Sequence, residues 1–128
     1  MNKVRYDAGL EVRKAVLGPD YVNRSIQNAT PFTKPMQDLV TEYCWGTIWS
    51  REGIDRKTRS VINLAMLTAL NRPHEVEIHV HGALNNGVTH EEIQEVFLQA
   101  AIYCGVPAAM DSFRIAQRVI DQRAKDQA

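Results

Sequence analysis

Three of the chain's four histidines lie in one short segment, NRPHEVEIHVHGALNNG at residues 71–87. The segment contains His74, Glu75, His79 and His81, four side chains that can take part in acid–base chemistry, among residues that are otherwise rich in apolar types. A purely structural core helix avoids histidine, because burying a polar group without a hydrogen-bond partner costs free energy. The segment is therefore predicted to carry chemistry on a structural element.

Two conformations are compatible with this segment. The run VEIHVH alternates apolar and polar residues, and as a strand it would place His79 and His81 on one face, an H-x-H pair that could hold a metal. As a helix it would place them about 200° apart, where they cannot share one site. The flanks favour the helix, since Pro73 suits a first turn, Asn71 a cap, and Gly87 a left-handed stop.

The rest of the chain predicts further helices joined by short loops, and the sequence therefore indicates one all-α domain over residues 1–128. Thr89 and Glu92 form a capping-box pattern that begins the helix after Gly87. The last six residues, RAKDQA, are predicted to be frayed. The other helices expected are Tyr6–Leu17, a short one capped by Asp20 and reaching about Asn28, a longer one after Thr33, Arg56–Leu70 capped by Asp55, Glu91–Tyr103, and one opened by Pro107.

The helix after Thr33 has two faces that do not look solvated. Helical spacing predicts a core stripe made of Met36, Leu39, Val40, Tyr43 and Thr47. Glu42, Trp45 and Trp49 fall within about 60° of one another on a second face. That face is open to two interpretations, an oligomer interface, where tryptophan is enriched, or the wall of a pocket that contains a carboxylate. Both interpretations apply if the pocket lies at a junction between subunits.

Two later segments complete the predicted core. The run VINLAMLTAL at residues 61–70 is apolar nearly all round, as expected of a helix buried on most sides. In the last helix, Met110, Phe113 and Ile120 are expected to line the inner side.

The composition excludes several classes of protein. The chain has 128 residues, enough for one domain with a real core. Fifteen basic and fifteen acidic residues give no net charge, so nothing suggests binding to nucleic acid or to an anionic membrane. The start, MNKVRYDAGLEVR, has no apolar run of the signal-peptide kind. We expect a cytoplasmic protein in which Cys44 and Cys104 are buried, reduced thiols.

The chain resembles the carboxymuconolactone decarboxylase family, in its 4-carboxymuconolactone decarboxylase branch. The likeness runs from about Gly9 to Val119, and it is clearest in the stretch from YCWGTIWSREGIDRKTRS to AIYCGVPAA. The resemblance implies the all-α fold of the AhpD-like alkylhydroperoxidases, with about six to seven helices. It also implies trimeric or hexameric rings. Because residues 61–70 and the indole face are too apolar for a small monomer, we expect an obligate oligomer, a hexamer.

The peroxidase relatives in this fold carry C-x-x-C-x-x-x-H-x-x-x-A-x-x-x-G. His79, Ala83 and Gly87 fill the last three positions, but Arg72 and Glu75 stand in place of the two cysteines. A glutamate that relatives place one helix earlier corresponds to Ser60. Without the thiol couple, peroxidase chemistry is not possible here.

The resemblance implies decarboxylation of 4-carboxymuconolactone, a dicarboxylate lactone, to 3-oxoadipate enol-lactone and CO2. The conjugated lactone is its own electron sink, so no cofactor or metal is expected. Arginines suit the retained carboxylate because the guanidinium is a bidentate donor. We expect His79 or His81 to deliver the proton, with Glu42 orienting a histidine or relaying the proton. The substrate-binding candidates are Arg51, Arg72 and Arg59, with Trp45 and Trp49 as an apolar wall.

Two other classes remain open from the sequence. One is a metal-dependent enzyme that uses the H-x-H pair on a strand. The other is a non-catalytic helical oligomer, or one of different specificity, in which the tryptophan face is only an interface and each histidine is a satisfied structural residue.

Overall fold

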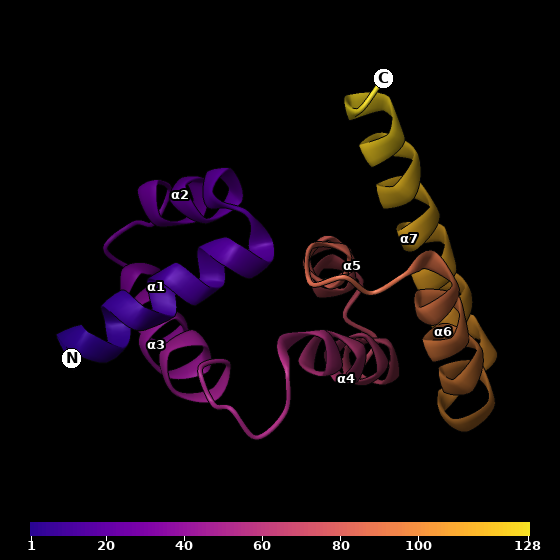
Figure 1. Ribbon diagram of the computed structural model, residues 1–128, viewed down its shortest axis with the longest axis horizontal. Coiled ribbons are helices and arrows are strands. Elements are labelled where there is room, and N and C mark those ends of the chain that lie inside the picture. Colours follow the sequence, from indigo (N-terminus) through magenta and orange to yellow (C-terminus); the bar gives the residue numbers. More distant parts are fainter. The chain divides into compact units, whose positions relative to one another are not determined.

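The computed structural model describes residues 1–128, and it contains seven α-helices, one π-helix and no strand (Figure 1). The predicted all-α class is thus confirmed. The helices fall into two compact units, Met1–Arg56 and Lys57–Ala128, each with its own core. In chain order they are α1 (Lys3–Leu17), α2 (Pro19–Gln27), α3 (Lys34–Leu39), the π-helix η1 (Val40–Ile48), α4 (Arg56–Ala69), α5 (Pro73–Asn85), α6 (His90–Cys104) and α7 (Val106–Asp126).

The N-terminal unit is built on the packing of α1 against η1. Val12 and Val16 of α1 meet the indoles of Trp45 and Trp49, and these four buried side chains form the core of the unit. Figure 1 shows α2 folding back beside α1, in agreement with the contacts between the two helices.

The predicted core stripe of this unit is wrong, and its second half lies in the π-helix η1. The backbone N–H of Trp49 donates to the carbonyl of Cys44, five residues earlier, at 3.0 Å. Thr41, Trp45 and Trp49, spaced by four residues, share the buried face. The expected stripe lies largely on the outside: the exposed fractions of Met36, Leu39 and Tyr43 are 62%, 55% and 55%.

The C-terminal unit has the larger core, to which all four of its helices contribute. Helix α7 lies beside α6 and also packs against α5 (Figure 1). The buried hydrophobic residues of this core are Leu64, Val76, Val80, Ala83, Val88, Ile93, Phe97, Ile115, Ala116 and Val119.

Local signals fix both ends of α5. Pro73 is the first helical residue, as predicted, but the N-cap is Arg72 and not Asn71. Because Pro73 takes the first helical position, the cap falls to the residue directly before it. Asn71 adopts a positive φ of 55°, which asparagine tolerates better than most residues. Gly87 has φ 88°, the left-handed conformation expected of a helix stop. The capping box between Thr89 and Glu92 is confirmed.

Helix α4 is less buried within the chain than its sequence predicts. Only one face, with Ser60, Leu64 and Thr68, is buried. Ile62 and Met66 on the other faces are 40% and 49% exposed, so the expectation of burial on most sides is wrong for the isolated chain.

Several smaller predictions are also corrected. Helix α1 begins at Lys3, with Asn2 as its N-cap residue. The N-cap residue of α2 is Gly18 and not the predicted Asp20. Helix α7 continues through Asp126, so RAKDQA is mostly helical; basic side chains in the last turn complement the helix dipole. Met110 of α7 is 48% exposed, because the buried stripe runs instead through Ala109, Ser112, Ile115, Ala116 and Val119.

The two cysteines, Cys44 and Cys104, are exposed rather than buried. Among the helices, none combines the length and the apolar character needed to cross a bilayer.

Candidate active site

The histidine-bearing segment is helical, so His79 and His81 project from different faces of α5. The strand with an H-x-H metal pair does not form. His79 is largely buried, and this burial lowers its pKa to about 4, with an opposing effect from the negative charge of Glu75. At neutral pH the free protein therefore holds His79 as a neutral imidazole.

His81 occupies the face of α5 that meets α7. Its Nδ1 lies 3.1 Å from Nη1 of Arg123, and Nη2 of the same guanidinium donates to Oδ1 of Asn85 at 3.0 Å. Partial burial, followed by the positive charge of Arg123, lowers the pKa of His81. The two histidines thus sit in different chemical environments although they are two residues apart.

Ser60 is fully buried in α4. Its Oγ accepts a hydrogen bond from Nδ2 of Asn86 at 2.9 Å, at the C-terminal end of α5. The hydroxyl therefore links α4 to the end of the histidine helix.

The three predicted arginines occupy different elements. Arg72 is the exposed residue that precedes α5, and Arg59 is a partly buried residue of α4. Arg51 is exposed and follows η1 in the N-terminal unit. Arg59 and Arg72 thus share the C-terminal unit with both histidines, and Arg51 belongs to the unit with Glu42 and the tryptophans.

Glu42 has a definite structural task in the N-terminal unit. Its Oε1 accepts a hydrogen bond from the backbone N–H of Asn2 at 2.8 Å. Asn2 in turn caps α1 by accepting from the backbone N–H of Arg5 at 3.1 Å. The carboxylate therefore holds the N-cap residue of α1 against η1.

The two tryptophans are core residues of the N-terminal unit. Their rings stack with centroids 4.6 Å apart and planes 24° apart, and only 3% of Trp45 and 5% of Trp49 is exposed. Because the chain itself covers both indoles, they are not the open face of an oligomer interface. Their role as the wall of a substrate site stays a prediction.

Sequence reasoning missed a buried arginine in the same unit. Arg13 is 5% exposed, and its Nη1 donates to Oε1 of Gln37 at 3.0 Å and to Oγ1 of Thr41 at 3.1 Å. Desolvation lowers the pKa of this guanidinium. The signal in the sequence was its position: Arg13 lies on the same helical stripe as Gly9, Val12 and Val16.

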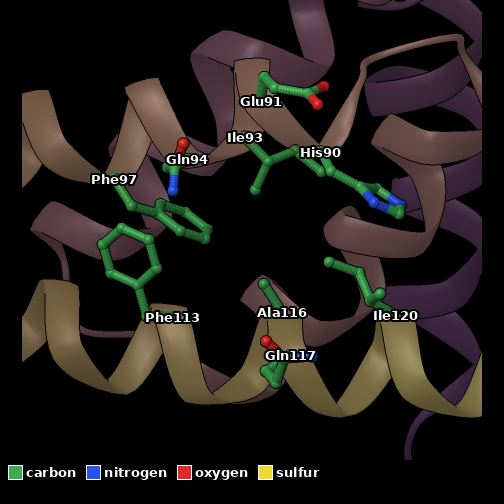
Figure 2. A pocket seen from close by; sticks show the side chains of 9 residues that line it. All are labelled: His90, Glu91, Ile93, Gln94, Phe97, Phe113, Ala116, Gln117 and Ile120. Atoms are coloured by element: carbon green, nitrogen blue, oxygen red, sulfur yellow. The ribbon is translucent and has the colours of Figure 1, made fainter.

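The fourth histidine, His90, lines a cavity of about 380 Å³ between α6 and α7 (Figure 2). The rings of Phe97 and Phe113 point into this cavity and meet edge to face, with centroids 5.6 Å apart. A second cavity, of about 500 Å³, lies between α4 and α6 and is lined mainly by apolar side chains such as Val61 and Val96. None of the predicted site residues lines either cavity.

Comparison with known proteins places the chain in a family. The model of the carboxymuconolactone decarboxylase family matches residues 34–118. The chain is 47% identical over 116 residues to nitrosuccinic acid decarboxylase of Metarhizium robertsii, covering 91% of this chain and 81% of that protein. It is 42% identical over 115 residues to 4-carboxymuconolactone decarboxylase of Acinetobacter baylyi, covering 90% and 86%. With a family match over most of its length and two such relatives, the chain belongs to the carboxymuconolactone decarboxylase family.

Proposed function

We propose that this protein is a carboxy-lyase that converts 4-carboxymuconolactone to 3-oxoadipate enol-lactone and CO2 without a cofactor. The observation that carries the proposal is the 42% identity with a 4-carboxymuconolactone decarboxylase over 90% of the chain. The reaction belongs to the protocatechuate branch of the β-ketoadipate pathway, by which aromatic compounds are degraded.

The chemistry needs no external electron sink. The carboxylate that leaves is attached to a ring carbon next to a double bond conjugated with the lactone carbonyl. As the carbon–carbon bond breaks, its electron pair moves through the double bond to the carbonyl oxygen and forms a dienolate. One proton is then added to the ring carbon beside the carbonyl. The protein must therefore hold the retained carboxylate, stabilise the oxygen, and supply one proton per turnover.

Nitrosuccinate is a second candidate substrate, because a nitrosuccinic acid decarboxylase is 47% identical to this chain. In nitrosuccinate the nitro group takes up the electron pair and becomes a nitronate, which is protonated on carbon. Both acids carry the departing carboxylate on a carbon that also bears a CH2–COO⁻ group and an electron sink. One arrangement of arginines, oxygen-directed donors and an acid serves both reactions.

We assign the acid to His79. Its pKa of about 4 means that the free protein does not store the proton at neutral pH. A bound dicarboxylate places negative charge in the site, which raises the pKa of a nearby imidazole. We therefore propose that His79 takes up a proton together with the substrate and transfers it to carbon after CO2 has left.

For the retained carboxylate we propose Arg72 and Arg51 first and Arg59 third, since each offers a bidentate fork. Trp45 and Trp49 are proposed as the apolar wall near the departing carboxylate, where a dry environment favours loss of charge. We propose Glu42 as the carboxylate that orients a histidine or relays the proton; in the single chain it accepts a hydrogen bond from the backbone N–H of Asn2.

We also propose a homohexamer that works in the cytoplasm. The support is apolar surface that the single chain leaves uncovered on α6, on α7 and in the turn after α4: Ile102, Val106 and Leu70 are exposed by 80%, 54% and 62%. Burying such surface against another subunit favours assembly, because it removes apolar area from water. Light scattering tests this proposal, and an active, stable monomer at micromolar concentration would contradict it.

The decisive experiment measures turnover of both acids by the purified protein after dialysis against a chelator. We expect conversion of the lactone, followed by its ultraviolet absorbance, at a rate that added metal ions do not change. The ratio of kcat/KM for the lactone and for nitrosuccinate then identifies the preferred substrate. A folded oligomer that turns over neither acid would refute the proposal and favour a non-catalytic oligomer.

A further inference from the structure

A cavity of about 400 Å³ lies within the N-terminal unit and is lined by residues of α1, α2 and α3 and of the turn after α2. No residue of the C-terminal unit lines it. Ile26 and Tyr6 give the lining hydrocarbon surface, and its polar side chains are Lys3, Lys34, Gln37 and Asp38. Since a cavity of about 150 Å³ already holds a benzene molecule, this cavity admits a small organic molecule.

The buried guanidinium of Arg13 contacts the lining of this cavity through Gln37. Arg13 is 5% exposed, both of its hydrogen-bond partners are uncharged, and its Nε has no hydrogen-bond partner. The titratable groups that act on its charge belong to Tyr21, Cys44 and Tyr6, and none of them is a carboxylate. Buried charges in proteins are normally paired, so Arg13 is a positive charge that no acidic group of the chain balances directly.

The guanidinium also fixes the orientation of the Gln37 amide. Arginine carries only donors, so the Gln37 atom that lies 3.0 Å from Nη1 is the acceptor Oε1. The amide nitrogen Nε2 is left with two N–H donors, and no group of the chain accepts from them. Nε2 is accessible, and the cavity is the space that Gln37 lines. Arg13 therefore holds a hydrogen-bond donor at the cavity.

Two ammonium groups add further donors. Nζ of Lys34 lies 2.7 Å from Oδ2 of Asp38, and this hydrogen bond raises the pKa of Lys34. An ammonium has three N–H donors, so two of those on Lys34 remain for another acceptor. Lys3 pairs with Asp7 at 3.3 Å, but both side chains are more than half exposed, so this ion pair is weak. With Arg13, three cations face two carboxylates, and this group of residues keeps a net positive charge.

We propose that this cavity is a binding site for the carboxylate of a small organic acid. The carboxylate accepts charge-assisted hydrogen bonds from Nε2 of Gln37 and from Lys34, in the field of the buried Arg13. The hydrocarbon part of the acid contacts Ile26 and the ring of Tyr6, which favours an organic acid over an inorganic anion such as phosphate. The site belongs to the N-terminal unit alone, so it is additional to the chemistry proposed for α5 and does not depend on the proposed function.

Isothermal titration calorimetry with hexanoate, and separately with inorganic phosphate, tests this proposal. The main variant is Gln37→Glu, which keeps an oxygen beside Arg13 but replaces the free N–H donors with a carboxylate oxygen. The matched control is Gln27→Glu, the same substitution at an exposed position of α2 that does not line the cavity. Lys34→Met, at an exposed position of α3, is a second variant that disturbs no buried group.

We expect the wild type to bind hexanoate saturably and phosphate more weakly. Gln37→Glu should weaken hexanoate binding by roughly 10- to 100-fold, because a donor to a charged group is lost and a like charge is added. Lys34→Met should also weaken it, whereas Gln27→Glu should bind as the wild type does. The new carboxylate of Gln37→Glu pairs with Arg13, so its urea midpoint should be no lower than that of Gln27→Glu. The loss of binding is then not a loss of folding.

Several results would overturn the proposal. They are no saturable binding of hexanoate by the wild type at millimolar concentration, phosphate binding as tight as hexanoate binding, and wild-type affinity in both Gln37→Glu and Lys34→Met. A Gln37→Glu protein less stable than Gln27→Glu would contradict the unbalanced charge of Arg13.

One further variant separates this site from the proposed substrate site. Arg72→Ala should keep the wild-type affinity for hexanoate, because Arg72 does not line the cavity. Binding that is lost in Arg72→Ala and kept in Gln37→Glu would place the acid at the proposed substrate site and refute this inference. A wild type that binds hexanoate but turns over neither the lactone nor nitrosuccinate would refute the proposed function and leave this inference standing.

Discussion

Gly9 of α1 and Gly46 of η1 face each other across the closest approach of their two helices. A Cβ atom added to Gly9 would overlap the carbonyl oxygen of Thr41 and would lie 2.6 Å from the backbone nitrogen of Gly46. A Cβ added to Gly46 would overlap the carbonyl oxygen of Arg5. The obstructing atoms are backbone atoms, so the two helices pack with no room for a side chain at this point.

Gly9→Ala should therefore destabilise the protein by at least about 1–3 kcal/mol, the cost of overpacking a close contact. The gain in helix propensity from glycine to alanine, about 1 kcal/mol, is too small to offset a backbone overlap. Urea unfolding followed by circular dichroism measures the difference. Gly53→Ala is the control, because an added Cβ there meets no atom within 4 Å. Equal midpoints for the two variants would contradict the close packing.

Local chemistry in the sequence predicted much of the C-terminal unit. Pro73 fixed the start of α5, Gly87 its stop, and Thr89 with Glu92 the start of α6, because each signal depends on neighbours only a few residues away. The helical assignment of the histidine segment, and with it the separation of His79 from His81, followed from those signals.

The features that were missed depend on distant residues or on a change of helical type. The α-helical period grouped Trp45 and Trp49 on one face of the helix after Thr33, but it did not indicate that α1 covers that face, with Val12 and Val16 against the indoles. The contact of Arg123 with His81 joins residues 42 apart, and no local pattern indicates it. The position of Arg13 on an apolar stripe was a usable signal, but its partners, 24 and 28 residues away, were not.

Trp45→Ala should lower the free energy of unfolding by about 3–5 kcal/mol, because it removes a buried, stacked indole from a small core. Tyr43→Ala provides the control, since Tyr43 is an aromatic residue of the same π-helix that is 55% exposed. Denaturant midpoints of the two variants measure the contrast. A Trp45→Ala protein as stable as Tyr43→Ala would show that the indole is not part of the core.

The protein should lose stability as the pH falls from about 6.5 to about 4, with His79 as one cause. Burial holds the folded-state pKa below the unfolded value, so in this window the unfolded chain binds a proton that the folded protein does not. Above about pH 6.5 His79 is neutral in both states and does not lower the free energy of unfolding. By about pH 4 protonation of His79 in the unfolded chain has lowered the free energy of unfolding by roughly 3 kcal/mol.

Urea titrations of wild type and His79→Gln across this pH range measure the effect. The difference in stability between the two proteins should shift in favour of the variant as the pH falls. His74→Gln, at an exposed position of the same helix, should keep the wild-type pH dependence. A constant difference between wild type and His79→Gln would show that His79 titrates alike in both states.

His79→Gln should also lower kcat by about 10²–10⁴-fold while changing KM far less, because a proton donor acts mainly in the transition state. His74→Gln is again the matched control and should remain close to wild type in both constants. Steady-state assays with the preferred acid measure the two effects. If His79→Gln folds and turns over at the wild-type rate, the acid is another group.

Arg72→Ala and Arg51→Ala should raise KM strongly and leave kcat much less affected. A guanidinium that clamps the retained carboxylate binds the substrate and the transition state alike, so its loss weakens both to the same extent. A hydrogen bond to a charged group contributes about 1.5–3 kcal/mol, which corresponds to an increase in KM of roughly 10- to 150-fold.

The control for the arginine variants is Arg114→Ala, which removes an exposed arginine that pairs with Asp111 at 2.9 Å on α7. It should leave KM unchanged, because loss of an exposed ion pair affects stability by less than about 1 kcal/mol and takes no charge from the site. Arg72 is the N-cap residue of the histidine helix α5. If Arg72→Ala and Arg51→Ala both keep the KM of Arg114→Ala, the clamp lies elsewhere, and Arg59 is the next residue to replace.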